Sequence, residues 1–364
     1  MRNYLLIITF LPIIISFPPI LEFQFDIFNR LLEKNPNNNI VISPISIFEI
    51  LSLVSNGAVG KTQLEILKTL KSNTVIELNR YLETINKILY LKQESSIIYI
   101  ANAIFSKVKI KKEFTDISKR YFVDISPLYS HIQINEWVKK NTNNKITNMI
   151  ESIENIRLLL INAIYFKSDW FNKFRKELTE EGIFNNKDKV HYMNNIFTSN
   201  EYYEDENVQI TSLYYSSYKF KAIIVLEKEG KKFDINKVNN YIKKFKKKNV
   251  KLILPKFKIE YNIDLIEILK EMGMEISFTE MANFNNLSEN SELFINQIKH
   301  KSFLEVNEDG TEAGSSTVIA MNDALVVDYY NMIVNRPFFF GIIHQDIQDT
   351  FIFTLISYLN YFNI

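Results

Sequence analysis

The feature that most constrains the fold is the run at residues 158–166, LLLINAIYF, in which Asn162 is the only strongly polar residue. A strand that is apolar along its whole length has both faces buried, whereas a half-exposed strand alternates apolar and polar residues. A chain of 364 residues is long enough to cover such a strand from both sides. The run therefore predicts a buried strand at the centre of a layered domain.

The segments around this run show both helical and extended patterns. Apolar spacing predicts helices over residues 24–32, 46–55, 61–70, 135–150 and 263–272, and a lysine-rich helix before residue 250. Extended patterns predict strands over residues 94–107 and 250–259, with mostly strands after residue 202. No repeat, linker or shift in composition divides the chain. We therefore expect one α+β (mixed α/β) domain over residues 17–364.

Several classes of chemistry are excluded by composition. The chain contains no cysteine, which excludes disulfides, a thiol nucleophile and thiolate metal sites. Its histidines are too far apart for a histidine-pair zinc motif, and the sequence contains neither a phosphate-binding glycine motif nor a serine-hydrolase elbow. The net charge of +1 does not favour nucleic acid. We expect no metal, no cofactor and no enzymatic activity; a catalytic triad assembled from scattered residues is the alternative.

The start of the chain has the pattern of an export signal. Arg2 precedes an apolar run that is too short to span a bilayer. We interpret residues 1–16 as a signal peptide, which predicts a secreted, extracellular protein without a membrane segment. The alternative is a buried N-terminal strand or helix in a cytoplasmic protein, although the nearby prolines oppose a long helix. In an exported chain, Asn286 of the sequon Asn286-Leu287-Ser288 is a candidate glycosylation site.

One strong cluster of positive charge lies in the predicted lysine-rich helix. It consists of Lys243, Lys244, Lys246, Lys247, Lys248 and Lys251. Basic runs bind polyanions such as sulfated glycans, so the cluster is a candidate polyanion site. The alternative is a solvated helix face that binds nothing.

The segment that follows Glu308 carries the strongest functional signal. Residues 310–318 read GTEAGSSTV, mostly small side chains without a proline. In an extended chain alternate residues share a face, which brings Thr311, Ala313, Ser315 and Thr317 together without a charge. This face could enter a packed sheet, while Glu312 stays in water. A charge at Thr311 or Ala313 would be buried without a partner and would cost several kcal/mol.

Short motifs along the chain resemble, in their order, those of the serpins, a family of serine protease inhibitors and non-inhibitory relatives. The resemblance extends from Phe25 to about Phe353. It rests on NIVISPIS at 39–46, TNNKI at 142–146, NAIYFKSDW at 162–170, LPKFKI at 254–259, HK at 300–301 and NRPF at 335–338. Asn144 and Ser168 replace glycines that the family usually carries, and Tyr214 replaces a proline. These departures leave the segment after Glu308 intact.

The resemblance implies three β-sheets, eight or nine helices and an exposed reactive-centre loop at about residues 308–334. A target protease cleaves this loop, which then inserts into the main sheet and traps the protease covalently. By position the loop hinge comprises Glu308, Gly310, Thr311, Ala313, Ser315 and Thr317. The shutter, a hydrogen-bonded cluster beneath the opening sheet, comprises Ser43, Ser46, Asn162 and His300. The breach at the top of the sheet comprises Trp170, Lys256 and Glu308, with an expected ion pair between Lys256 and Glu308.

Two positions for the cleaved bond are compatible with the resemblance. The commonest family spacing from Glu308 puts the bond between Ala324 and Leu325, which suits an elastase-like protease with a small primary pocket. Some viral serpins are one residue shorter and carry aspartate before the cut. Aligned with them, the bond lies between Asp323 and Ala324 and suits a caspase or granzyme B. Export favours the first bond, because caspases are intracellular.

We therefore expect a secreted, monomeric suicide inhibitor whose partner is a target serine protease. One alternative is a non-inhibitory serpin with a binding or chaperone-like role. Another is a viral-type inhibitor of aspartate-specific proteases, if Asp323 precedes the cut bond.

Overall fold

A computed structural model of the chain describes residues 18–36, 38–90, 96–289, 292–311, 328–347 and 350–357. Within these ranges the helices are α1 (Pro18–Lys34), α2 (Pro44–Gly57), α3 (Gly60–Thr69), α4 (Val75–Leu89), α5 (Lys112–Arg120), α6 (His131–Asn141), α7 (Val238–Ile242) and α8 (Ile266–Glu271). The first eight strands are β1 (Ile40–Ile42), β2 (Ser96–Ser106), β3 (Val123–Pro127), β4 (Leu158–Asp169), β5 (Glu180–Phe184), β6 (Asp188–Glu204), β7 (Val208–Tyr214) and β8 (Phe220–Glu227). The remaining strands are β9 (Lys246–Pro255), β10 (Phe257–Asp264), β11 (Gln297–Val306), β12 (Gly310–Thr311), β13 (Tyr330–Ile333), β14 (Phe338–His344) and β15 (Phe351–Ser357).

The apolar run at residues 158–166 forms most of β4, and all nine of its residues are buried, as predicted. β4 belongs to a six-stranded sheet with the order β10-β11-β12-β4-β2-β3. It pairs antiparallel with β2 and parallel with β11. The two-residue β12 lies between β4 and β11 at one end and pairs with both. We call this six-stranded sheet the main sheet.

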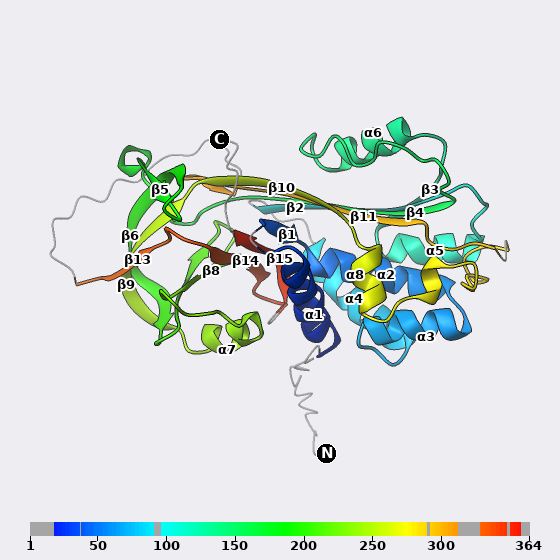
Figure 1. Cartoon of the computed structure of the whole chain (residues 1–364), viewed down its shortest axis with the longest axis horizontal. Helices are drawn as coiled ribbons and strands as arrows, with labels where there is room; N and C mark the ends of the chain where they lie inside the picture. The colour runs from blue at the N-terminus through cyan, green and yellow to red at the C-terminus, as the bar shows by residue number, and fades with distance from the viewer. Residues whose placement is uncertain are drawn as a thin grey trace, which may run out of the picture.

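The two faces of β4 enter different cores, because side chains alternate along a strand. Leu158, Leu160 and Phe166 belong to the large core, and Leu159 and Ile161 belong to a smaller one. Figure 1 shows α6 alone on one side of the main sheet, while most of the other helices pack on the opposite side. The central strand is therefore covered on both faces, as its composition requires.

The second sheet has nine strands in the order β1-β15-β14-β8-β7-β6-β9-β13, with β5 paired to β6. β6 is 17 residues long and changes register against β9 between Phe197 and Asn200. Its first residues pair with β5, residues 192–202 pair with β9, and its last residues pair with β7. The two smaller sheets expected from the resemblance are thus joined here through β6. Among the described strands, β13 pairs only with β9.

Helix α2 passes through the large core and fixes residues beneath the main sheet. Every residue of α2 except Asn56 is buried. Ser43 is its N-cap and accepts a hydrogen bond from the backbone nitrogen of Ser46, while Pro44 occupies the first turn, where a missing N–H costs nothing. This helix start places Ser43 and Ser46 below β4.

The lysine cluster does not lie on a helix, so that prediction is wrong. Helix α7 ends at Ile242, and β9 begins at Lys246. Val250, Leu252 and Leu254 are buried at every second position of β9. Because β6 and β13 supply hydrogen-bonding partners on either side, tertiary pairing outweighs the helical preference of a lysine run.

Other boundaries also differ from expectation. The helix predicted over 135–150 ends at Asn141, where Thr142 Oγ1 donates to the Val138 carbonyl and accepts from the Ile146 amide. Asn144 then adopts a φ of 61°, which explains why an asparagine can replace glycine there. The strand predicted over 250–259 is divided into β9 and β10, and the helix predicted over 263–272 covers only Ile266–Glu271. Within the described part of the chain, no helix is long and apolar enough to cross a membrane.

Candidate functional site

The four predicted shutter residues lie together beneath the main sheet. Asn162 of β4 is the register partner of His300 on β11 and of Asn102 on β2. Its side-chain oxygen accepts a hydrogen bond from Ser46 Oγ at 3.0 Å and also contacts His300 Nδ1. All four predicted residues are buried, so this network is closed to water.

The hydrogen bonds of His300 specify its protonation state. Its Nδ1 contacts the Asn162 side-chain oxygen, an acceptor, so Nδ1 carries the proton. Its Nε2 accepts from the backbone nitrogen of Ser43 at 3.3 Å. Complete burial lowers the pKa of His300 to about 3, because no water stabilises an imidazolium there. His300 is therefore a neutral structural histidine that joins α2 to β4 and β11.

The network extends to two residues that the sequence analysis did not identify. Asn162 donates to the side-chain oxygen of Asn102, whose Nδ2 donates to Glu49 Oε2 at 3.2 Å. Burial raises the pKa of Glu49 to about 8, and the neighbouring Tyr90 and Asn102 only partly offset this effect. The sequence signal for Asn102 is a polar side chain inside the otherwise apolar stretch of β2, and the signal for Glu49 is that it is the only charged residue of α2. The Glu49 carboxyl group beside the shutter therefore stays protonated to a higher pH than an exposed glutamate does.

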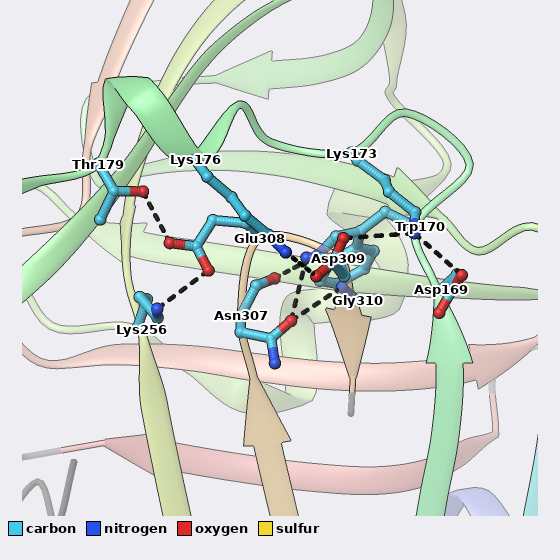
Figure 2. A network of polar contacts seen from close by, with 10 residues as sticks. All are labelled: Asp169, Trp170, Lys173, Lys176, Thr179, Lys256, Asn307, Glu308, Asp309 and Gly310. Atoms are coloured by element: carbon cyan, nitrogen blue, oxygen red, sulfur yellow. Dashed lines mark hydrogen bonds and ion pairs between the residues drawn. The ribbon is translucent and has the colours of Figure 1, made fainter. Parts of the chain in front are cut away.

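The predicted breach residues also meet, and the expected ion pair is present (Figure 2). Lys256 Nζ lies 3.0 Å from Glu308 Oε2, and Thr179 Oγ1 donates to Glu308 Oε1 at 2.8 Å. Trp170 Nε1 donates to the Asn307 carbonyl at 2.9 Å. Burial alone would raise the pKa of Glu308, but the hydrogen bonds from its own backbone, Thr179 and Lys256 together lower it. Glu308 is therefore an ionised carboxylate with only 7% of its side chain exposed.

A second acidic residue, Asp309, was missed and is bound as firmly (Figure 2). Lys176 Nζ lies 2.6 Å from one carboxylate oxygen of Asp309, and Lys173 Nζ lies 3.4 Å from the other. The Asp309 carbonyl accepts from the Trp170 backbone nitrogen at 2.8 Å. Lys173 also pairs with Asp169 at the end of β4. The chain just before the hinge is thus fixed to the end of the main sheet through both side chains and backbone.

The hinge begins inside the main sheet. Thr311 is fully buried, pairs with Ser168 on β4 and Val306 on β11, and its hydroxyl lies 2.7 Å from that of Tyr215. Gly310 approaches β4 so closely that an added Cβ would lie 2.2 Å from the Ser168 carbonyl oxygen. Only glycine fits there without a shift of the backbone. The sequence signal for Tyr215 is its place in the motif Leu213-Tyr214-Tyr215, which resembles a family block.

Several predicted site residues lie outside the described residues. They are the hinge residues Ala313, Ser315 and Thr317, both candidate bonds at Asp323, Ala324 and Leu325, and residues 1–16. The sequon residue Asn286 is described and exposed, whereas Ser288 of the same sequon is buried and donates to the Lys109 carbonyl.

Comparison with known proteins gives a consistent result. A family model described as serpin (serine protease inhibitor) matches residues 20–355. The human leukocyte elastase inhibitor is 31% identical over 359 residues, covering 89% of this chain and 94% of that protein. The native-state structure of the thermophilic serpin tengpin matches with a TM-score of 0.85 and 30% identity, covering 94% of this chain and 93% of that one. Human thyroxine-binding globulin in complex with its ligand matches with a TM-score of 0.85 and 25% identity, covering 94% and 97% of the two chains.

The breach ion pair gives a first test. Lys256→Met should lower the free energy of unfolding by about 1–3 kcal/mol, because Glu308 would keep a buried negative charge with one partner fewer. Urea unfolding at neutral pH measures this change. The matched control is Lys270→Met, which removes the exposed pair with Glu267 and should cost under about 1 kcal/mol. Equal effects of the two substitutions would show that the buried Glu308 does not depend on Lys256.

The buried carboxyl group gives a second test, through pH. The folded-state pKa of Glu49 is raised, so its contribution to stability is complete below its unfolded value near 4.5 and is lost as pH rises through about 8. Glu49→Gln keeps the shape of the protonated acid without this loss. As the pH rises from 6 to 9, the free energy of unfolding of the variant should increase relative to that of the parent by about 1–3 kcal/mol. Urea unfolding at each pH measures this difference. A difference that does not change with pH would show that Glu49 does not titrate in this range.

Proposed function

The chain belongs to the serpin family, and on that premise we propose that it is a suicide-substrate inhibitor of a serine protease. The observation that carries the proposal is β12, in which Gly310 and Thr311 already form a strand between β4 and β11. An inserting loop needs a starting point in the sheet with a fixed register. The ion pairs of Glu308 and Asp309 hold this starting point in place.

Insertion beyond Thr311 would require β4 and β11 to part. These strands pair directly from Leu159 and Gln297 to Tyr165 and Phe303. Each further loop residue would pair one residue further back along β4, so Thr317 would come opposite Asn162. The contact between Asn162 and His300 would then break. The hydroxyl of Thr317 would come close to these two side chains and could replace the hydrogen bond that each of them loses. The shutter is therefore the step at which polar contacts would be exchanged.

The direction of Thr311 supports the predicted burial pattern of the loop. Thr311 contacts Tyr215, which belongs to the large core. By strand alternation Ala313, Ser315 and Thr317 would enter the same side. Small uncharged residues can pass between packed strands there, and a charge cannot without a large desolvation cost. The gain from the added strand would come from new backbone hydrogen bonds and buried surface.

The chemistry of trapping would belong to the protease. Its serine would attack the carbonyl of the residue before the cut bond, the peptide amine would leave, and an ester would join the two proteins. Insertion would have to outpace hydrolysis of this ester. A cut between Ala324 and Leu325 suits a protease with a small primary pocket, and the similarity to the leukocyte elastase inhibitor supports this choice. A cut between Asp323 and Ala324 would instead suit an aspartate-specific protease.

A second candidate is a non-inhibitory carrier. The similarity to thyroxine-binding globulin in complex with thyroxine supports it, since a serpin fold can bind a small molecule. The proposal also retains export, which rests on residues 1–16, and glycosylation at Asn286. An exported inhibitor would meet extracellular proteases.

The direct test is incubation with a panel of serine proteases of different primary specificity. An inhibitor should give a covalent complex that survives SDS electrophoresis, and the cleaved protein should melt at a higher temperature than the intact one. Mass spectrometry of the released peptide would identify the cut bond. Cleavage without a complex and without added thermal stability would exclude the inhibitor.

The side-chain pattern gives a sharper test. Thr311→Arg should convert the inhibitor into a substrate, because an unpaired charge at this buried position would cost several kcal/mol whenever residue 311 is held in the sheet, as the inserted loop requires. The complex band should disappear while cleavage continues. Glu312→Arg is the matched control, because its side chain would lie on the opposite face and stay in water. Ala313→Arg provides a second test in case Thr311→Arg perturbs β12 in the intact protein. Inhibition by both Thr311→Arg and Ala313→Arg at the parent rate would refute the insertion argument.

A further inference from the structure

The lysine cluster surrounds the point where the reactive segment re-enters the fold. Tyr330 is the first residue of β13, and Tyr329 directly precedes it. Lys251 Nζ lies 5.9 Å from the ring centre of Tyr329, and Lys248 Nζ lies 5.0 Å from that of Tyr330. Both tyrosines are partly exposed, at 41% and 38%. We call Lys248, Lys251, Tyr329 and Tyr330 the collar.

The charges of the collar are available to a partner. Within the described part of the chain, Lys246, Lys247, Lys248 and Lys251 form no ion pair with a carboxylate; Lys248 and Lys251 rest on tyrosine rings. The carboxylate of Glu201, across β9 from Lys247, is bound by Ser212 and Lys221. Asp328 precedes Tyr329, and its backbone carbonyl accepts a hydrogen bond from the Asn249 side chain at 3.4 Å. The positive charges therefore outnumber the free negative ones.

The position of the collar decides what would meet it. From Leu325 or Ala324 to Asp328 there are three or four residues, which span at most about 11 or 14 Å. A protease domain of about 230 residues has a radius of gyration of about 17 Å. The radius of a protease bound at either candidate bond thus exceeds the length of chain between that bond and the collar. Its surface beside the active site must therefore face Lys248 and Lys251.

We infer that the collar is a docking surface for an acidic patch beside the active site of the target protease. This inference rests on the proposed inhibitory function and adds the kind of partner that the surface selects. The tyrosine rings hold the ammonium groups at the edge of the loop, which reduces the side-chain entropy lost on contact. Charges of this kind raise the rate of encounter more than the strength of the final complex.

The lysine cluster was predicted to bind a polyanion such as a sulfated glycan, which stays a prediction; for the collar we propose the protease instead. A linear glycan needs an extended row of cations on one face. Lys248 and Lys251 are three positions apart on β9, so strand alternation puts them on opposite faces of the sheet. A protease that surrounds the bound loop can contact both lysines. A glycan that lies along one face of β9 can contact only one of them.

The test compares rates of covalent complex formation with a protease trapped by the parent protein. At about 50 mM salt, the double variant Lys248→Gln with Lys251→Gln should form the complex about three- to tenfold more slowly. The difference should shrink at about 500 mM salt, where exposed charges are screened. The fraction of cleavage events that end in a complex should not change, because the hinge is untouched.

The matched control is Lys61→Gln with Lys68→Gln, which removes two exposed lysines from α3. Figure 1 shows α3 at the opposite end of the molecule from β9 and β13. This control should keep the parent rate at both salt concentrations. A collar variant with the parent rate at low salt would overturn the inference. Weaker retention of that variant on immobilised heparin, with an unchanged rate without heparin, would assign the lysines to a glycan and also overturn it. If no protease forms a complex with the parent, the proposed function fails and the inference fails with it.

Discussion

The contact between Asn162 and His300 is the interaction on which the rest of the structure depends. It lies where β4 and β11 pair directly, and it is buried on all sides. The same asparagine reaches Ser46 at the start of α2 and Asn102 on β2. One amide therefore joins three strands and a helix. A sheet held together by polar groups can open by exchanging partners, whereas an all-apolar seam would have to expose its surface to water.

The end of the main sheet is held by a different kind of interaction. Glu308 and Asp309 are ionised carboxylates bound by Lys256, Lys173 and Lys176. Both carboxylates are largely buried, so salt screens their pairs with Lys256 and Lys173 less than a surface pair, whereas Lys176 is exposed. They fix the chain immediately before Gly310, and β12 follows in a set register. The chain contains no cysteine, so no disulfide restrains β4 and β11 from parting.

Much of the site follows from short motifs. The spacing of serine, asparagine and histidine motifs identifies Ser43, Ser46, Asn162 and His300, and the structure brings all four together. The ion pair of Lys256 with Glu308 is also correctly predicted. Asn102 and Glu49 were not predicted, although they complete the same network from residues 53 positions apart. Their role depends on how α2 lies against β2, which a local pattern does not encode.

The sequence by itself determined the buried central strand, the run of small residues after Glu308 and the motif residues that meet at Asn162 and at Glu308. Each of these is set by alternation or by spacing, which are properties of the chain alone. Only the tertiary structure decided that Lys246, Lys247, Lys248 and Lys251 lie on a strand, that Asp309 binds a lysine 136 positions away, and that burial raises the pKa of Glu49. The physical reason is that strand pairing, ion pairing and desolvation depend on which distant segments are brought together. The local preference of a lysine run for helix is the same wherever the run lies. The segments that pack beside it decide whether it forms a helix or a strand.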